Sequence, residues 1–146
     1  MNSEKKTATI LEDVKINVKI KLAALWVAVM FLFLYADYFT LYLPGIIEDA
    51  IAGKIGPFPT TQVVLLAAMT LMTIPSFMVF LSLTLKPKAN RWTNIIVGIL
   101  FIVVQLSSLF VGESWAYYIF ASIVEVVLLS LIVVYAWKWP KQEVSP

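Results

Sequence analysis

Four long apolar runs make up most of the chain and limit what it can fold into. They cover about residues 22–43, 61–85, 93–111 and 115–137. A helix needs about 20 apolar residues to cross the ~30 Å hydrocarbon core of a bilayer, and each run is about that long. The mean hydropathy is +0.90, and only 14% of the 146 residues are charged. We therefore expect an all-α integral membrane protein, a four-helix bundle over residues 22–140 with no second domain.

The ends of these runs carry residues that stop or start helices. Pro44 and Pro140 follow the first and fourth runs, and Gly112 follows the third. Either Thr60 or Thr61 can cap the first turn of the second run with its hydroxyl group, and Asn90 can cap the third helix with its side chain. Pro75 lies inside that run and predicts a kink, because proline removes one backbone hydrogen bond from a helix.

Two connecting segments leave more than one interpretation open. The stretch VKINVKIK, residues 14–21, alternates apolar and polar side chains as a strand would, but we favour an interfacial lead-in to the first helix. The stretch PGIIEDAIAGKIGPFP, residues 44–59, is too long for a tight turn. It is either a short surface helix over residues 46–52 that lies across the mouth of the bundle, or an ordinary surface loop.

The basic residues predict the orientation of the bundle. Ten of the eleven lie in segments that fall on one side of the predicted bundle, and Lys54 alone falls on the other. Cytoplasmic loops are enriched in Lys and Arg, so we expect both termini, with segments 1–21 and 141–146, in the cytoplasm. Segment 1–21 is too polar for a signal peptide. Aromatic residues are expected at the two membrane interfaces, namely Trp26, Tyr42, Trp92, Trp115, Tyr117, Trp137 and Trp139.

Histidine and cysteine are both missing from the chain, which narrows its chemistry. The usual ligands of zinc, copper and haem iron are absent, and so is the commonest general base. We therefore expect no metal site and no cofactor. The net charge of +2 is small, so nucleic acid is not an expected partner. The expected partners are the lipid bilayer, a small or lipophilic ligand, and a second copy of the chain, because so short a bundle would need to dimerise to enclose a path.

Acidic residues inside the apolar runs are the candidate functional groups. Glu125 lies ~15 Å from the outer end of the fourth run and Asp37 ~9 Å from that of the first, at 1.5 Å per residue. Polar residues of the other two runs reach similar depths. Ionisable groups inside membrane spans are costly and usually mark a site. We expect a polar pocket in the outer half of the bundle, formed by Glu125, Asp37, Gln105, Thr73, Tyr118 and Ser122.

The helical spacing suggests how these acids are satisfied. Tyr118 and Ser122 share a helix face with Glu125, and Thr40 shares one with Asp37, so their hydroxyl groups are expected to bond to the acids. No Lys, Arg or His is expected at that depth. Because an unpaired charge is unstable in an apolar setting, at least one of the two carboxyl groups is expected to be protonated.

Several motifs resemble those of a family of small bacterial four-span membrane proteins known only as a domain of unknown function. The resemblance covers residues 22–140 and is carried by LYADYFTL, ANRWTNIIVG and YYIFASIVEVVLLSLIVVYAWKWP. It implies an inner-membrane location and no assigned activity. The resemblance implies that seven positions are shared with the family, namely Tyr35, Ala36, Asp37, Asn90, Arg91, Trp92 and Glu125.

Three classes of function remain open from the sequence. The first is a proton-linked transporter or a membrane protein that binds a small or lipophilic ligand near Glu125. The second is a structural or accessory subunit, in which the acids only hold helices together. The third is an enzyme that acts on a lipid, with Glu125 and Asp37 as a proton-transfer pair.

Overall fold

The computed structural model describes residue 11 and residues 13–111 and 115–141. Parts of the predicted terminal segments 1–21 and 141–146, and the predicted helix end at Gly112, lie outside the described residues.

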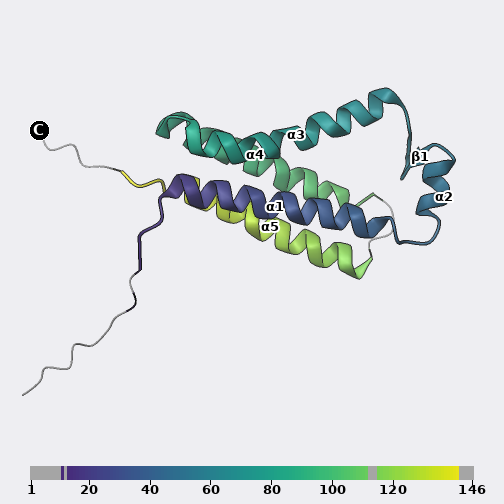
Figure 1. The fold of residues 1–146 in the computed structure, drawn as a ribbon, viewed down its shortest axis with the longest axis horizontal. Coiled ribbons are helices and arrows are strands. Elements are labelled where there is room, and N and C mark those ends of the chain that lie inside the picture. Colours follow the sequence, from purple (N-terminus) through teal and green to yellow (C-terminus); the bar gives the residue numbers. More distant parts are fainter. Residues whose placement is uncertain (1–10, 12, 112–114, 142–146) are drawn as a thin grey trace, which may run out of the picture.

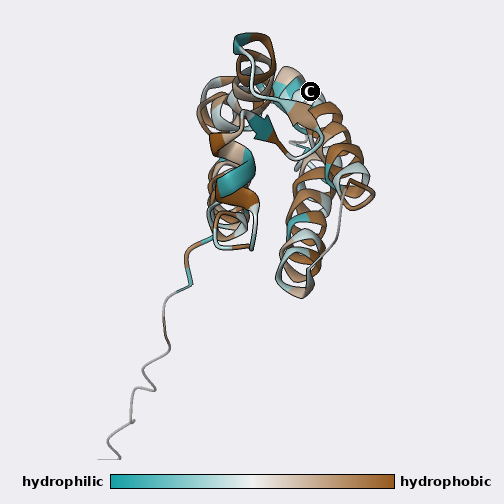
Figure 2. Cartoon of the chain, turned by 90° about the vertical axis from the view of Figure 1, so that its right-hand side faces the viewer, coloured by the Kyte–Doolittle hydropathy of each residue, from teal (hydrophilic) through white to brown (hydrophobic). Residues whose placement is uncertain are grey.

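Four long helices run alongside one another and a small outer segment joins two of them (Figure 1). Each long helix is apolar and long enough to cross a membrane, which confirms the predicted number of apolar helices. Figure 2 shows that hydrophobic residues predominate along these helices. In chain order the elements are α1 (Val18–Thr40), α2 (Ile46–Ile51), β1 (Lys54–Ile55), β2 (Phe58–Pro59), α3 (Gln62–Thr84), α4 (Pro87–Ser108) and α5 (Ala116–Trp137).

Two helices begin earlier than the hydropathy predicts, because of their caps. The side chain of Asn17 accepts a hydrogen bond from the backbone N–H of Lys19 (2.9 Å), so α1 begins within the alternating segment. Pro87 occupies the first turn of α4, where its missing N–H costs nothing. Of the two candidates Thr60 and Thr61, it is Thr61 that caps α3, and its hydroxyl accepts from the N–H of Val64 at 3.2 Å.

The outer segment between α1 and α3 contains both a short helix and a hairpin. Strands β1 and β2 are antiparallel, with Lys54 opposite Pro59 and Ile55 opposite Phe58. Gly45 precedes α2 with a φ of 84°, a left-handed conformation that favours glycine. The segment lies beyond the ends of the long helices (Figure 1). Of the two interpretations of this segment, the short helix is therefore confirmed, over Ile46–Ile51.

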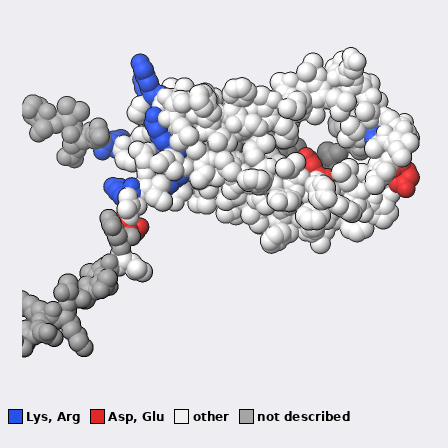
Figure 3. All heavy atoms as spheres, in the orientation of Figure 1, with Lys and Arg blue, Asp and Glu red and all other residues white. Residues whose placement is uncertain are grey.

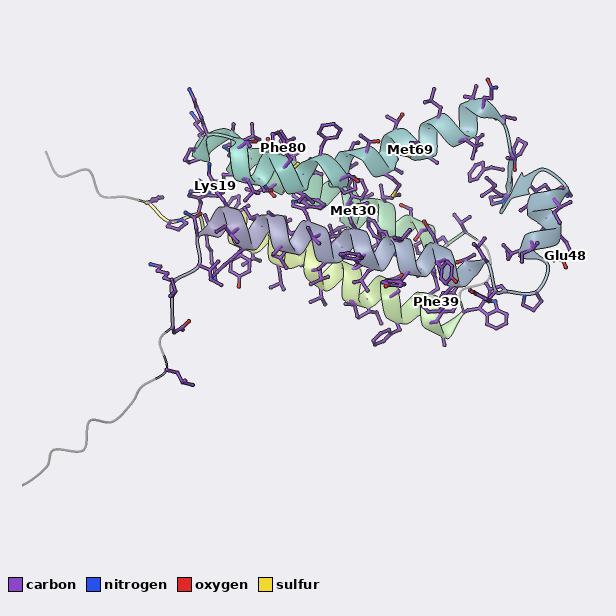
Figure 4. All side chains as sticks on the ribbon, viewed as in Figure 1. Lys19, Met30, Phe39, Glu48, Met69 and Phe80 are labelled. Carbon is purple, nitrogen blue, oxygen red and sulfur yellow. The ribbon has the colours of Figure 1, made fainter. Side chains whose placement is uncertain are left out.

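Most of the charged residues separate along the long axis of the molecule. Figure 3 shows a cluster of Lys and Arg at one end, which we call the basic end, and acidic atoms near the other, which we call the hairpin end. Lys19 lies at the basic end and Glu48 at the hairpin end (Figure 4). The ammonium group of Lys19 donates to the backbone oxygens of Leu83 (3.2 Å) and Leu85 (2.8 Å) at the C-terminus of α3. This contact ties α3 to α1 at the basic end.

The half of the bundle nearer the basic end is tightly packed around a buried polar network. The indole N–H of Trp26 donates to Asn94 Oδ1 (2.7 Å), and Asn94 Nδ2 donates to Asn90 Oδ1 (2.7 Å). Asn90 Nδ2 in turn donates to the backbone oxygen of Ser82 (2.6 Å). The network links α1, α4 and α3. Two expectations are therefore wrong, because Trp26 is fully buried instead of interfacial and Asn90 lies inside α4 instead of capping it.

Helices α4 and α5 approach closely at Gly98. A Cβ atom added to Gly98 would lie 2.8 Å from Val133 Cγ2, closer than carbon atoms normally come. A small residue is therefore needed there, as at many helix contacts in membranes. The apolar side chains around this contact are fully buried, namely Phe101, Leu129, Ile132 and Ala136.

Candidate functional site

A small pocket lies in the other half of the bundle, toward the hairpin end. Its volume is about 120 Å³, which is space for a few water molecules or one small ligand. Residues of all four long helices line it, and none from α2 or the hairpin. The lining residues are Phe33, Ala36, Asp37, Met72, Phe101, Val104, Gln105, Ser108, Tyr118 and Glu125.

Glu125 is the most unusual side chain of the pocket. It lies one turn from Ser122 on the inward face of α5 and is only 1% exposed. Neither of its carboxyl oxygens, Oε1 or Oε2, has a hydrogen-bond partner within the described residues. A buried polar group without a partner is destabilising, and a carboxylate there would be more so than the neutral acid.

Asp37 reaches the same pocket from α1. Its side chain is exposed in the isolated chain, so it lies at the edge of the pocket while Glu125 lies inside. The two acids, 88 positions apart in the sequence (125 − 37), therefore line one cavity.

The polar neighbours of Glu125 are bonded to each other and not to the acid. Gln105 Nε2 donates to the hydroxyl of Ser122 (2.8 Å), and the hydroxyl of Tyr118 donates to that of Ser108 (2.9 Å). The expected hydrogen bonds from Tyr118 and Ser122 to Glu125 are thus wrong. The reason is that α4 presents its own polar groups to the same face of α5 and pairs with these hydroxyls first. Gln105 and Tyr118 line the pocket, whereas Ser122, which was predicted to form it, is not among the lining residues.

Thr73 and Thr40 do not lie where they were expected: Thr73 was predicted to line the pocket and Thr40 to bond to Asp37. Thr73 does not line the pocket, because its hydroxyl donates to the backbone oxygen of Met69 (2.7 Å) within α3. Thr40 likewise bonds to the backbone oxygen of Ala36 (2.9 Å) and to the hydroxyl of Tyr117 (2.8 Å), not to Asp37. Within a helix, the nearest available acceptor for a threonine hydroxyl is the backbone carbonyl oxygen one turn earlier. Both threonines donate to that oxygen.

The pocket is open beside α3 because that helix bends away from the bundle. Pro75 is buried, so its ring lies on the inward face of α3. The proline ring clashes with the preceding turn of α3 and pushes that turn away from the inward face. Residues 62–74, which we call the α3 arm, therefore diverge from α4, and none of the buried residues of α3 lies in this arm. Figure 3 shows an opening there with acidic atoms inside, and Met69 lies on the arm (Figure 4).

Several lining residues were not anticipated. Phe33 precedes Asp37 by one helical turn, and Phe101 and Ser108 lie one turn either side of Gln105. The i, i+3 and i+4 spacing around each polar residue could have identified them. The aromatic part of the pocket wall follows from this spacing and not from the polar residues alone.

The arrangement can hold and exchange a proton, and it can bind a small polar molecule. Its acids and hydroxyls offer oxygen atoms, and no Lys or Arg is among the lining residues. Within the described residues there is no group of three or more acidic, His or Cys side chains that could hold a metal ion. The chemistry of the pocket thus depends on the carboxyl groups of Glu125 and Asp37.

Comparison with known proteins identifies the family but no activity. No curated protein and no solved structure matches the chain. One protein family matches over residues 10–146, and its description is a family of unknown function (DUF6326). The match covers all four long helices and both acids of the pocket. The chain belongs to this family of unknown function, DUF6326.

Proposed function

We propose that this chain is a multi-pass protein of a bacterial inner membrane, with the basic end and both termini in the cytoplasm. Its four candidate spans and their exposed apolar surfaces support insertion into lipid. The gathering of Lys and Arg at one end supports the orientation, because cytoplasmic loops carry an excess of these residues.

Within the membrane, we propose that the protein binds a small or lipophilic ligand in the pocket and exchanges a proton through Glu125. The observation that carries this proposal is the state of Glu125, which is buried, faces the cavity and has no hydrogen-bond partner within the described residues. Intramembrane acids of this kind mark proton or ligand paths.

The other buried polar side chains of the bundle provide the comparison. Asn90, Asn94 and Ser82 near the basic end are hydrogen-bonded to one another, and Gln105 and Ser122 are bonded across α4 and α5. A carboxyl group that served only to hold helices together would be satisfied in the same way. The carboxyl group of Glu125 has no such hydrogen bond within the described residues, which favours a functional role over a structural one.

The pocket serves either a binding protein or a proton-linked transporter. It opens beside the α3 arm, while the packed half around Trp26 and Phe101 separates it from the basic end. Transport would therefore require a second arrangement, in which the packed half opens and the α3 arm closes. Binding alone requires only the arrangement described.

Infrared spectroscopy of the purified protein tests the proton exchange. We expect a carboxylic acid band from Glu125 that weakens as the pH rises and that is missing from Glu125→Gln. The matched control is Glu48→Gln, which removes an exposed acid of α2 and should leave the band unchanged. A Glu125 that stays in one protonation state between pH 5 and pH 9 would contradict the proposal.

A structural or accessory role is the second candidate, and α3 favours it. Only 11% of the apolar window of α3 is buried, against 28% for each of the other three long helices. Such a surface suits contact with another membrane protein or a second copy. If this role is correct, Glu125→Gln should leave every proton and ligand measurement unchanged, and substitutions on the α3 arm should disrupt assembly.

A further inference from the structure

We propose that the ligand of the pocket is a small alkylammonium cation, which replaces the proton of Glu125. This inference rests on the proposed function, since it names the ligand class of the same site. Four properties of the pocket select such a cation: its charge, its aromatic wall, its volume and its opening.

The charge of the lining favours a cation. The side chains that line the pocket with Glu125 come from every neighbouring helix, and the titratable ones among them are Asp37 from α1 and Tyr118 from α5. Helices α3 and α4 contribute only uncharged groups, Met72, Gln105 and Ser108. None of the described residues that line the pocket carries a positive charge that could balance an ionised Glu125. A cationic ligand would supply that balance.

The aromatic wall favours an organic cation over a metal ion. Phe33 and Phe101 both line the pocket and stack with their ring centroids 6.1 Å apart. An ammonium group is attracted to the face of an aromatic ring, and its alkyl carbons pack against the ring as well. A sodium, magnesium or calcium ion would bind through the oxygen-bearing side chains alone and would leave the apolar faces of these two rings without a contact.

The volume and the opening limit the size of the cation. The pocket, at about 120 Å³, is somewhat smaller than the engineered cavity of ~150 Å³ that accepts benzene. A cation of about five non-hydrogen atoms therefore fits. A longer alkyl tail could leave through the opening beside the α3 arm, where apolar side chains face outward.

The proton and the cation exchange in a balanced step. In the free protein Glu125 is a neutral acid. When the ammonium ion enters with its own charge, Glu125 releases its proton to water or buffer and remains as a carboxylate beside the cation. The total charge of the pocket is unchanged. The apparent affinity should therefore rise about tenfold per pH unit over the range in which free Glu125 is protonated.

Titration calorimetry on the full chain in detergent micelles tests this inference. The probe is tert-butylammonium chloride, and the comparison compounds are tert-butyl alcohol, which has the same shape without the charge, and sodium chloride. Measurements in two buffers with different ionisation enthalpies count the protons released. We expect binding of the ammonium ion only, with about one proton released per cation.

Three variants identify the groups responsible. Glu125→Gln should weaken binding at least about thirtyfold, which corresponds to the ~2 kcal/mol lower bound for removing one partner of a buried charge pair. Glu48→Gln is the matched control and should bind as the unchanged protein does. If Glu125→Gln does not fold, Asp37→Asn replaces it, and it should bind more weakly while still releasing a proton.

Three results would overturn the inference: equal binding of the alcohol, equal proton release by sodium, or binding of the ammonium ion without proton release. None of these affects the infrared titration of Glu125. If that titration succeeds while the calorimetry fails, the pocket exchanges protons with another ligand class. If Glu125 does not titrate at all, the proposed function itself is wrong.

Discussion

Replacing Glu125 with methionine should make the protein more stable while abolishing the proposed proton exchange. Methionine has nearly the same length and volume, so it fills the same space on α5 without leaving a cavity. It also removes a carboxyl group whose two oxygens have no partner within the described residues. A group that is retained for function at a cost in stability is common at active and binding sites.

The expected gain follows from the burial of the side chain. Glu125 is 1% exposed, and the penalty for a buried polar group without a partner is about 1–3 kcal/mol. Neither oxygen is accessible to water in this structure, but a small rotation of the side chain toward the pocket would let water satisfy part of this group. We therefore expect Glu125→Met to raise the free energy of unfolding by about 1–2 kcal/mol, within that range.

Equilibrium unfolding in mixed detergent micelles, followed by tryptophan fluorescence, measures this gain. The matched control is Gln105→Met, at a similar depth on α4. Gln105 donates a hydrogen bond to Ser122 at 2.8 Å, so this substitution should lower the free energy of unfolding by about 1 kcal/mol. The two variants exchange a polar side chain for the same apolar one and should change stability in opposite directions.

A loss of stability in Glu125→Met equal to that in Gln105→Met would refute the reasoning. It would mean that Glu125 makes hydrogen bonds of structural value. The accessory role would then be the better account of the acid.

Three further substitutions test the packing described above. Gly98→Ala should destabilise the protein by about 1–3 kcal/mol in the same unfolding assay, because the new methyl group would lie against Val133; an unchanged midpoint would show that α5 moves aside freely. Trp26→Phe should cost at least about 1 kcal/mol by removing the N–H that donates to Asn94, and a smaller loss would mean that the network does not depend on it. Pro75→Ala should straighten α3 and bring the α3 arm closer to α4, measured as a shorter distance between spin labels on introduced cysteines; because the chain has no native cysteine, the labels are unambiguous. A longer distance would contradict the bend derived from the buried proline ring.

Much of the fold follows from the sequence because the constraint is simple. An apolar run of about 20 residues in a membrane protein has almost no alternative to a helix, so the four long helices were predictable. Their ends were less so. α4 begins at Pro87, within a polar stretch whose hydropathy suggests a loop, and the start is instead determined by the geometry of proline in a first helical turn.

The site was predictable only in part, because it depends on how the helices rotate and pair. Depth along each helix brought Glu125, Asp37 and Gln105 to one level, and the structure has all three around one pocket. The depth of a residue along its helix does not determine the hydrogen-bond partner of its hydroxyl group. Thr73 bonds within its own helix, and Ser122 bonds to Gln105, and both choices depend on competing acceptors that only the packed structure reveals.

Because α3 bends at Pro75, a small change of angle at the bend moves the far end of the α3 arm by a larger distance. The helix is held near the basic end by Lys19, and the thirteen residues of the α3 arm (62–74) extend ~20 Å beyond the bend. A change of ten degrees at the bend would move the far tip by roughly 3 Å, about the diameter of a water molecule. Small forces on the hairpin end can therefore change the width of the opening beside the α3 arm.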